Sequence, residues 1–531
     1  ILKKIKFIMG EKEKKYDRQL RLWGDHGQQA LENARICMIN VTATSTEILK
    51  NLILPGVGSF VIVDGGRISG EDVGNNFFLD PDAIGQSKSK VLFSFFVLRH
   101  NFSLELNPDV KGDYTEEDVN QLLNKNPQFF YSFEVVIVSA LDGATQRKLA
   151  ELLWERKIPL VICYSYGFTG YLRIVVNEHC VVESHPDNAH ADLRLLDPFP
   201  ELIEYANSID LEQMEKKEHS HVPYLIILYK YLQAWRKEND GQAPKNWKEK
   251  RQFKEKVLEG IRKNEHGVQE DEENFEEAAK QVNSALVPYK LPDSLRQMFE
   301  DPKCTDVSEE SSNFWILANG LKQFVENNDK SLLPLRGSLP DMFSDSESYI
   351  KLQNIYKAKA KQDIDLFTSY LCNFGYVNGR LSDQEIKRFC RNAHFLQVFL
   401  VNYFCRGRSL SDEYKKISQS VLDGLISEEA SDAVWYVMLR CVDLFHTNFS
   451  RYPGGCLQEL TRSWGVPGLS EAISDDYVQE TCRCGAAELH SVASYMGGVA
   501  AQEVIKLITS QYVPVTGVYI FNGLKSTSIS L

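Results

Sequence analysis

The stretch from Arg35 to Asp64, ARICMINVTATSTEILKNLILPGVGSFVIVD, constrains the fold of this chain more than any other. The apolar run at 36–39 predicts a buried strand, residues 47–54 an amphipathic helix, and residues 60–63 a second strand that ends at Asp64. A strand, a helix and a strand in this order form the start of a nucleotide-binding βαβ unit. We therefore expect an α/β, Rossmann-like fold.

The turn after the first strand lacks the glycines of a phosphate-binding loop. In such a loop, glycines let backbone amides approach a pyrophosphate at the helix N-terminus. The corresponding positions here are Asn40, Thr42 and Ser45. Their side chains would fill the phosphate space, and β-branched Thr42 resists the dihedral angles that glycine accepts. The sequence predicts that the chain keeps the fold and has lost the phosphate pocket.

Composition and net charge exclude several classes of function for this chain. The 531 residues are 43% hydrophobic and 11% aromatic, which is enough for three or four domains with sizeable cores. The net charge of -13 argues against nucleic acid or an anionic membrane as the main partner. No apolar run reaches the roughly 20 residues that span a bilayer. Eleven cysteines without a CxxC pair indicate reduced thiols. We interpret Met9 as the natural start and residues 1–8 as extraneous.

The pattern of the chain changes twice. Helical and β signals alternate from 16 to 176, with strands expected at 36–40, 60–64, 134–139, 158–163 and 171–176. From about 200 to 450 the pattern is largely helical, as at 223–235 and 349–367, and the end returns to a helix at 497–509 and a strand at 518–522. We therefore expect an α/β domain of residues 9–176 and 481–531, interrupted by a mainly helical insertion of residues 177–480.

Several other clusters are better explained by structure than by chemistry. Cys482 and Cys484 form a CxC beside a helix, a pattern that is more often structural than nucleophilic. The histidines between His179 and His190, and also His219 and His221, lack companion ligands at a metal-site spacing. The acidic stretch 270–277 is typical of a solvated helix face. We expect no metal and no nucleophilic cysteine.

Three separated segments resemble the adenylation domains of the activating enzymes for ubiquitin and ubiquitin-like proteins. They are YDRQLRLWGDHGQQAL from Tyr16, EILKNLILPGVGSFVIVD from Glu47 and GGVAAQEVIKLI from Gly497. With LPLRGSLPDMFSDSESYIKLQNIY from Leu333, the whole chain is similar to the regulatory subunits of the heterodimeric enzymes that activate the neddylation modifier. The similarity runs from Tyr16 to the C-terminus. It implies an adenylation domain of the ThiF and MoeB type.

The resemblance also implies a degraded nucleotide site. Active members have GxGxxG at the positions of Asn40, Thr42 and Ser45, and an arginine at the position of Asn76. They also have the TxPxCT thioester motif, which is missing here.

Three further positions match functional residues of active members. Asp64 matches a residue that holds the ATP ribose, Lys88 a phosphate-binding lysine, and Asp142 a magnesium ligand, although Gly143 follows Asp142 in place of asparagine. We favour a strand-end or helix-capping role for Asp64. The resemblance thus implies no cofactor on this chain, with ATP and magnesium bound by the catalytic subunit of the neddylation-activating enzyme.

Two segments are expected to serve that partner. Arg18, in the YxRQ motif, would reach the partner's ATP in trans, because a guanidinium stabilises phosphate charge without a pocket on its own chain. The alternative is an ordinary surface ion pair. Arg21, one turn later, is the second candidate. The strap PLRGSLPDM is expected to lie extended against the partner through Pro334, Leu335, Arg336, Gly337, Pro340, Asp341 and Met342.

The resemblance implies a non-catalytic subunit in the cytoplasm and nucleus. With its partner it would support ATP-dependent adenylation of the neddylation modifier and thioester formation on the partner's cysteine. The insertion would resemble a catalytic-cysteine domain without the cysteine and would flank the groove that holds the modifier. One alternative is the regulatory subunit for the SUMO-type modifier, which the long insertion disfavours. Another is a self-sufficient nucleotide enzyme, either an adenylating homodimer or an oxidoreductase, which the missing motifs disfavour.

Overall fold

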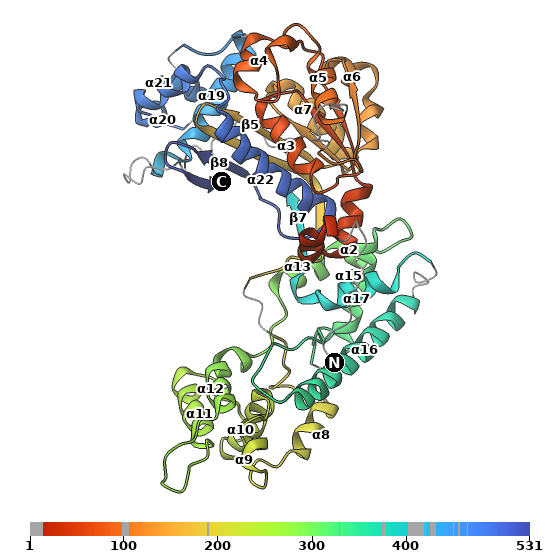
Figure 1. Ribbon diagram of the computed structural model, residues 1–531, viewed down its shortest axis with the longest axis vertical. Helices are drawn as coiled ribbons and strands as arrows, with labels where there is room; N and C mark the ends of the chain where they lie inside the picture. The colour runs from red at the N-terminus through yellow and green to blue at the C-terminus, as the bar shows by residue number, and fades with distance from the viewer. Residues whose placement is uncertain are drawn as a thin grey trace. The chain divides into compact units, whose positions relative to one another are not determined.

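The structure, a computed structural model, forms two compact units (Figure 1). It describes residues 14–97, 106–187, 191–328, 330–373, 379–401, 419, 421–424, 432–449, 451–454, 457–464 and 466–531. Unit 1 contains residues 1–181 and 398–531, and unit 2 contains residues 182–397.

Unit 1 is built on one mixed sheet. Its strands are β1 (Arg35–Ile39), β2 (Ser59–Val63), β3 (Lys111–Thr115), β4 (Val135–Val138), β5 (Leu160–Tyr166), β6 (Thr169–Val181), β7 (Gln397–Val401), β8 (Val518–Asn522) and β9 (Thr527–Ser530). The strand order is β3-β2-β1-β4-β5-β6-β8-β9, and β7 pairs with β6. The strands from β3 to β5 are parallel, whereas β6, β8 and β9 pair antiparallel with their neighbours. This topology confirms the predicted Rossmann-like α/β fold.

Helices of unit 1 cover both faces of the sheet. The α-helices are α2 (Asp17–Asn33), α3 (Ala43–Ile53), α4 (Gly70–Asn75), α5 (Lys88–Val97), α6 (Val119–Lys125), α7 (Gly143–Glu155), α19 (Val434–Phe449), α20 (Leu469–Ala472), α21 (Asp475–Cys484) and α22 (His490–Thr509). The 3-10 helices are η1 (Pro81–Ala83), η2 (Pro127–Ser132) and η4 (Leu457–Trp464).

Alternate side chains of β1 point to opposite faces of the sheet, and this explains why two cores form. Ile36 and Met38 are buried in one core with α3 and α22, while Cys37 and Ile39 are buried in the other with α7 and α19. Successive side chains of a strand point to opposite faces, so a strand that is apolar at every position must be covered on both sides. The helices α3 and α22 run side by side over the first core (Figure 1).

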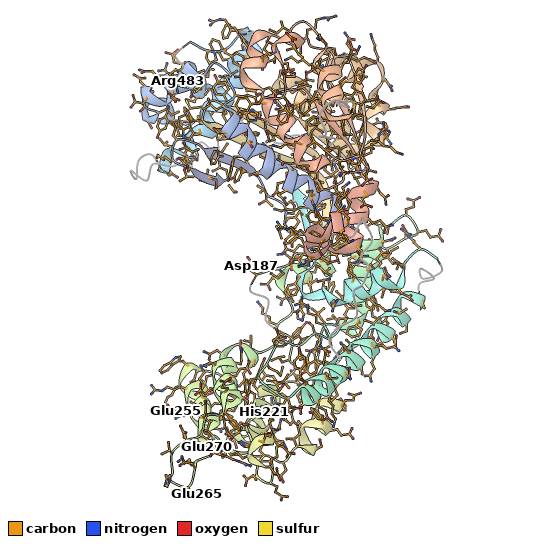
Figure 2. All side chains as sticks on the ribbon, in the orientation of Figure 1. Asp187, His221, Glu255, Glu265, Glu270 and Arg483 are labelled. Carbon is orange, nitrogen blue, oxygen red and sulfur yellow. The ribbon has the colours of Figure 1, made fainter. Side chains whose placement is uncertain are left out.

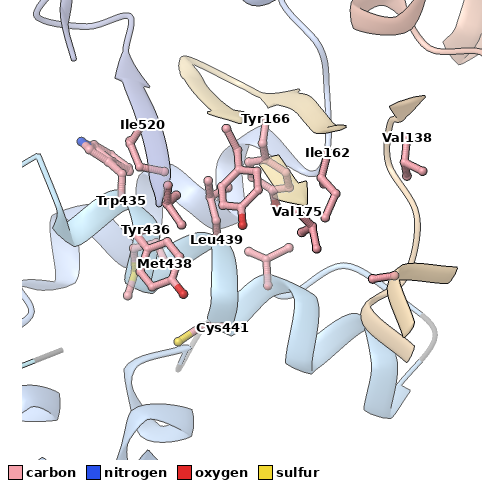
Figure 3. Close-up of a cluster of buried hydrophobic side chains, with 14 of the residues drawn as sticks. Val138, Ile162, Tyr166, Val175, Trp435, Tyr436, Met438, Leu439, Cys441 and Ile520 are labelled. Atoms are coloured by element: carbon pink, nitrogen blue, oxygen red, sulfur yellow. The ribbon is translucent and has the colours of Figure 1, made fainter. Parts of the chain in front are cut away.

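The described residues between 398 and 480 belong with the α/β unit in the structure, whereas the sequence pattern grouped this range with the insertion. The reason is α19, whose side chains from Val434 to Val442 are all buried. Trp435, Tyr436 and Met438 belong to the same buried cluster as Ile162 and Val175 of the sheet (Figure 3). Apart from Arg440, this part of α19 is apolar on all sides. Such a segment is recognised as buried from its sequence, but its partner is not.

Unit 2 is helical around its own core. It contains α8 (Pro200–Ser208), α9 (Lys216–His219), α10 (Tyr224–Glu238), α11 (Trp247–Glu259), α12 (Glu273–Ala285), α13 (Asp293–Glu300), α14 (Pro302–Thr305), α15 (Asn313–Glu326), α16 (Ser346–Asn373), α17 (Asp383–Arg391) and the 3-10 helix η3 (Ala393–Phe395). Buried side chains of α8, α10, α11, α12 and α16 meet in this core.

Candidate functional site

A pocket of about 770 Å³ lies in unit 1 where the parallel strands end. Its walls come from the loops after β1, β2 and β4, from α19, and from residues 485–488 between α21 and α22. Four predicted positions, Thr42, Asn76, Lys88 and Asp142, line it, whereas Asn40, Ser45 and Asp64 do not. The volume is typical of small-molecule sites. A pocket of the right size is therefore present. The expected loss concerns only the contacts that phosphate would make in it.

The loop after β1 is closed by its own side chains. Asn40 takes a left-handed backbone conformation (φ 66°), and its side-chain amide donates to the carbonyls of Ser139 and Ala140 at 3.1 Å each. Thr42 is extended and caps α3: its hydroxyl accepts from the amide of Ser45 at 3.1 Å, while the Ser45 hydroxyl accepts from the amide of Thr42 at 2.8 Å. This reciprocal capping box satisfies amides that a phosphate loop leaves open.

The two amides that lie between Thr42 and Ser45 are bound to a carboxylate from the distant segment before α22. Glu488 accepts from the amide of Ala43 at 2.7 Å and from that of Thr44 at 3.2 Å. Its Oε1 also accepts from the hydroxyls of Thr44 at 2.7 Å and Ser165 at 3.1 Å. The positive end of a helix dipole favours an anion here. Sequence reasoning missed Glu488 because no local pattern marks it.

Asp64 and Lys88 have structural partners. The Asp64 carboxylate accepts from the amides of Val41 and Gly66, each at 2.7 Å, and so joins the loops after β1 and β2. Burial raises the pKa of Asp64 despite these two bonds. The Lys88 ammonium lies 2.6 Å from Oδ1 of Asp72 at the half-buried edge of the pocket.

Asn76 and Asp142 also make local contacts. The buried Asn76 amide donates to the hydroxyl of Thr46 at 2.9 Å. Asp142 caps α7 by accepting from the amides of Ala144 and Thr145 at 3.1 and 3.0 Å. A β-carbon on Gly143 would stand 2.7 Å from Oδ2 of Asp443 on α19. The glycine next to Asp142 thus lets α19 pack close to the start of α7.

Arg18 differs from these positions because its side chain is exposed on α2. Among the residues that the structure describes, no hydrogen-bond or ion-pair partner holds its guanidinium. The neighbouring Tyr16 is buried, and its hydroxyl accepts from Asn107 at 2.9 Å, which anchors the start of the helix. Arg21 is already paired with Asp17, at 2.9 Å between NH2 and Oδ2. Of the two candidate arginines, therefore, Arg21 is engaged by a neighbouring carboxylate and Arg18 is not, among the described residues.

The strap from Pro334 to Met342 has no helix or strand, and it is packed against unit 2 itself. Leu335 is 2% exposed, and its amide donates to Asp363 of α16 at 2.9 Å. Gly337 has φ 74° and faces Ala360, while the Arg336 guanidinium lies 5.2 Å from the centre of the Phe395 ring. Contact between the strap and a partner stays a prediction. The exposed residues of the strap are Ser338 and Asp341.

The remaining clusters are structural where they are described. His219 is buried, and its Nδ1 lies 2.7 Å from Oε1 of the buried Glu272. We expected the acidic stretch 270–277 to be a solvated helix face, but it contains this buried carboxylate. Glu270, labelled in Figure 2, pairs with Lys216 at 2.6 Å. Burial raises the pKa of Cys484, which disfavours the thiolate that a nucleophile needs. His190 lies outside the described residues.

Neither a metal-binding cluster nor a membrane-spanning helix is present in the described part of the chain. No group of three or more His, Cys, Asp or Glu side chains is arranged to hold a metal ion there. Within the same residues, no helix has the length and apolar character needed to cross a membrane.

Comparison with known proteins places this geometry in a family. Residues 16–530 match the ThiF family. A "NEDD8-activating enzyme E1 regulatory subunit" of Xenopus laevis is 48% identical, covering 97% of this chain and 98% of that protein. The protein of the same name from Gallus gallus is 48% identical over 97% of both chains. The one from Drosophila melanogaster is 41% identical and covers 98% of both.

Proposed function

We propose that this chain, which belongs to the ThiF family and to the family of NEDD8-activating enzyme E1 regulatory subunits, is the half of a heterodimeric activating enzyme that does not itself perform the chemistry. The complex would adenylate the C-terminus of the neddylation modifier with ATP and then form a thioester. ATP, magnesium and the acceptor cysteine would belong to the catalytic partner subunit. This chain would supply a folded counterpart and the Arg18 guanidinium.

The observation that supports this proposal most is the contact between Glu488 and α3. The amides of Ala43 and Thr44, which a nucleotide-binding loop would direct at phosphate, are already bound to a carboxylate. A carboxylate and a phosphate cannot share these donors, because both carry negative charge. The same contact disfavours a self-sufficient nucleotide enzyme. Family membership disfavours the SUMO-type alternative.

Arg18 supports the other half of the proposal. An exposed arginine near an anchored helix start, without a partner among the described residues, is available to an anion that another chain holds. Arg21 is less suited, because its guanidinium is engaged by Asp17.

Exchange of pyrophosphate into ATP tests the proposal. The purified chain with the modifier should show no exchange above background, whereas the chain mixed with its catalytic partner should show modifier-dependent exchange. Exchange by the chain alone at the rate of the heterodimer would contradict the proposal. A chain that fails to raise the partner's exchange would contradict it as well.

A further inference from the structure

The donors around Glu488 form a complete anion site. Two are backbone amides at the start of α3, from Ala43 and Thr44, and two are hydroxyls, from Thr44 and from Ser165 of β5. Both hydroxyl-bearing residues are buried, Thr44 with 0% and Ser165 with 5% of the residue exposed. The two hydroxyls also lie 2.9 Å from each other. The site therefore combines the start of helix α3 with a side chain of strand β5, and is not a helix end alone.

The backbone of residues 485–488 aims this carboxylate at the site. Gly485 and Ala486 both have left-handed conformations, with φ of 54° and 68°, directly after α21. The amide of Gly167 then donates to the carbonyl of Ala487 at 2.7 Å, and Gly167 also forms a β-bridge with Glu488. An alanine rarely adopts a positive φ unless its surroundings hold it there. The position of Glu488 is thus determined by the fold.

We propose that Glu488 is an internal ligand that keeps this anion site closed, and that the site still binds inorganic phosphate once the carboxylate is removed. The proposal deepens the proposed function and rests on it in one respect, namely that this chain is the half without nucleotide. Asn40 keeps the left-handed conformation at the first of the three glycine positions, while its side-chain amide donates to the carbonyls of Ser139 and Ala140. The carboxylate would then exclude phosphate together with the side chains that replace the glycines.

The neighbouring charges set the expected affinity. Lys88 and Arg440 line the same pocket, and so do the carboxylates of Glu71, Asp72, Asp142 and Asp443. Lys88 pairs with Asp72, and Arg440 lies 3.6 Å from Asp443. The pocket therefore has no excess of positive charge, and the four hydrogen-bond donors carry the recognition of phosphate. Binding should be weak, and it should be lost when one of these donors is removed.

Titration of the full chain with inorganic phosphate at constant ionic strength, followed by calorimetry and by thermal melting, tests the proposal. Glu488→Ala should bind phosphate at least about tenfold more tightly than the unmodified chain, as expected when donors bound to a charged group become available. Glu503→Gln is the matched control. Its buried carboxylate accepts from the amide of Val515 at 2.7 Å and pairs with Lys506, and it takes no part in the contacts around Glu488, so its loss should leave phosphate binding unchanged.

Two further variants keep the test decisive. Thr44→Val in the Glu488→Ala background removes a hydroxyl donor and should reverse most of the gain. Glu488→Gln keeps the shape of the side chain if Glu488→Ala does not fold, and phosphate should raise its melting temperature more than that of the unmodified chain. Equal phosphate responses in the unmodified chain and the folded Glu488 variants would overturn the proposal, and so would a gain that Thr44→Val leaves intact. None of these measurements needs the partner, so their failure is distinct from failure of the exchange assay.

Discussion

Gly497 of α22 and Glu47 of α3 touch so closely that a β-carbon on Gly497 would stand 2.5 Å from the β-carbon of Glu47. The Glu47 carboxylate is buried and lies 2.9 Å from Nε2 of His490, and it also pairs with Lys50. The glycine thus sets the distance at which the two helices cross over the first core. For Gly498, the next residue, no described atom beyond the adjoining part of α22 itself lies within 4 Å of the position where its β-carbon would lie.

The two glycines should respond in opposite directions to alanine. Gly497→Ala must push α22 away from α3 and should lower the free energy of unfolding of unit 1 by about 1–3 kcal/mol. Gly498→Ala meets no obstacle among the described residues and should raise the free energy of unfolding by up to about 1 kcal/mol, the difference in helix propensity. Urea unfolding of both variants measures these changes in the free energy of unfolding. Equal losses would show that Gly498 is also needed for packing.

Arg18→Ala should slow adenylation of the modifier by the heterodimer roughly a hundredfold while leaving folding and dimerisation nearly unchanged. An arginine that acts on the transferring phosphate contributes on the order of 3 kcal/mol, which corresponds to that factor. Arg18→Lys should recover little, because an ammonium lacks the planar fork. Single-turnover adenylation at saturating and limiting ATP measures the effect.

Arg21→Ala is the matched control for Arg18. Its exposed pair with Asp17 should contribute below about 1 kcal/mol, so adenylation should change little. A normal rate for Arg18→Ala, together with a slow rate for Arg21→Ala, would move the role to Arg21.

Gly337→Ala should destabilise unit 2. The residue has φ 74°, and a β-carbon there would stand 2.7 Å from the β-carbon of Ala360 on α16. Gly241 has a similar φ of 77° but open space around it, so Gly241→Ala carries the backbone cost of about 1–2 kcal/mol without the clash. The loss of unfolding free energy for Gly337→Ala should exceed that of the control by about 1–3 kcal/mol in urea. Equal losses would mean that the strap moves aside freely.

His179 should make the chain sensitive to mild acid. Burial in β6 lowers the pKa of His179 from its ordinary value of 6.5 to about 4, and its Nε2 has no hydrogen-bond partner within the described residues. The unfolded chain therefore takes up a proton between these two pKa values while the folded chain does not. Stability is fully present above pH 6.5 and should fall by about 1.4 kcal/mol per pH unit below it, until about pH 4.

His179→Gln should remove this part of the acid sensitivity. Denaturant unfolding of both proteins at pH 7 and pH 5 measures it, and the comparison is of the pH-dependent loss, not of absolute stability. A loss as large in His179→Gln as in the unmodified chain would assign the acid sensitivity to other groups.

The sequence by itself determined the βαβ start, because strands β1 and β2 and helix α3 follow from the spacing of neighbouring apolar residues. It also determined the strand at 518–522, which the structure has as β8 with the same bounds. The sequence missed β3, whose residues KGDYT are polar and only partly buried, so they carry no strand signal. That strand forms because it pairs with β2.

Tertiary structure alone decided what occupies the start of α3. Asn40, Thr42 and Ser45 show from the sequence that glycines are missing, but not which group satisfies the amides behind them. Glu488 is 445 positions from Ala43, and its carboxylate reaches the site only because the chain returns through α19 and α21 to the same sheet. Helix and strand signals depend on residues a few positions apart, whereas this contact depends on how distant elements pack.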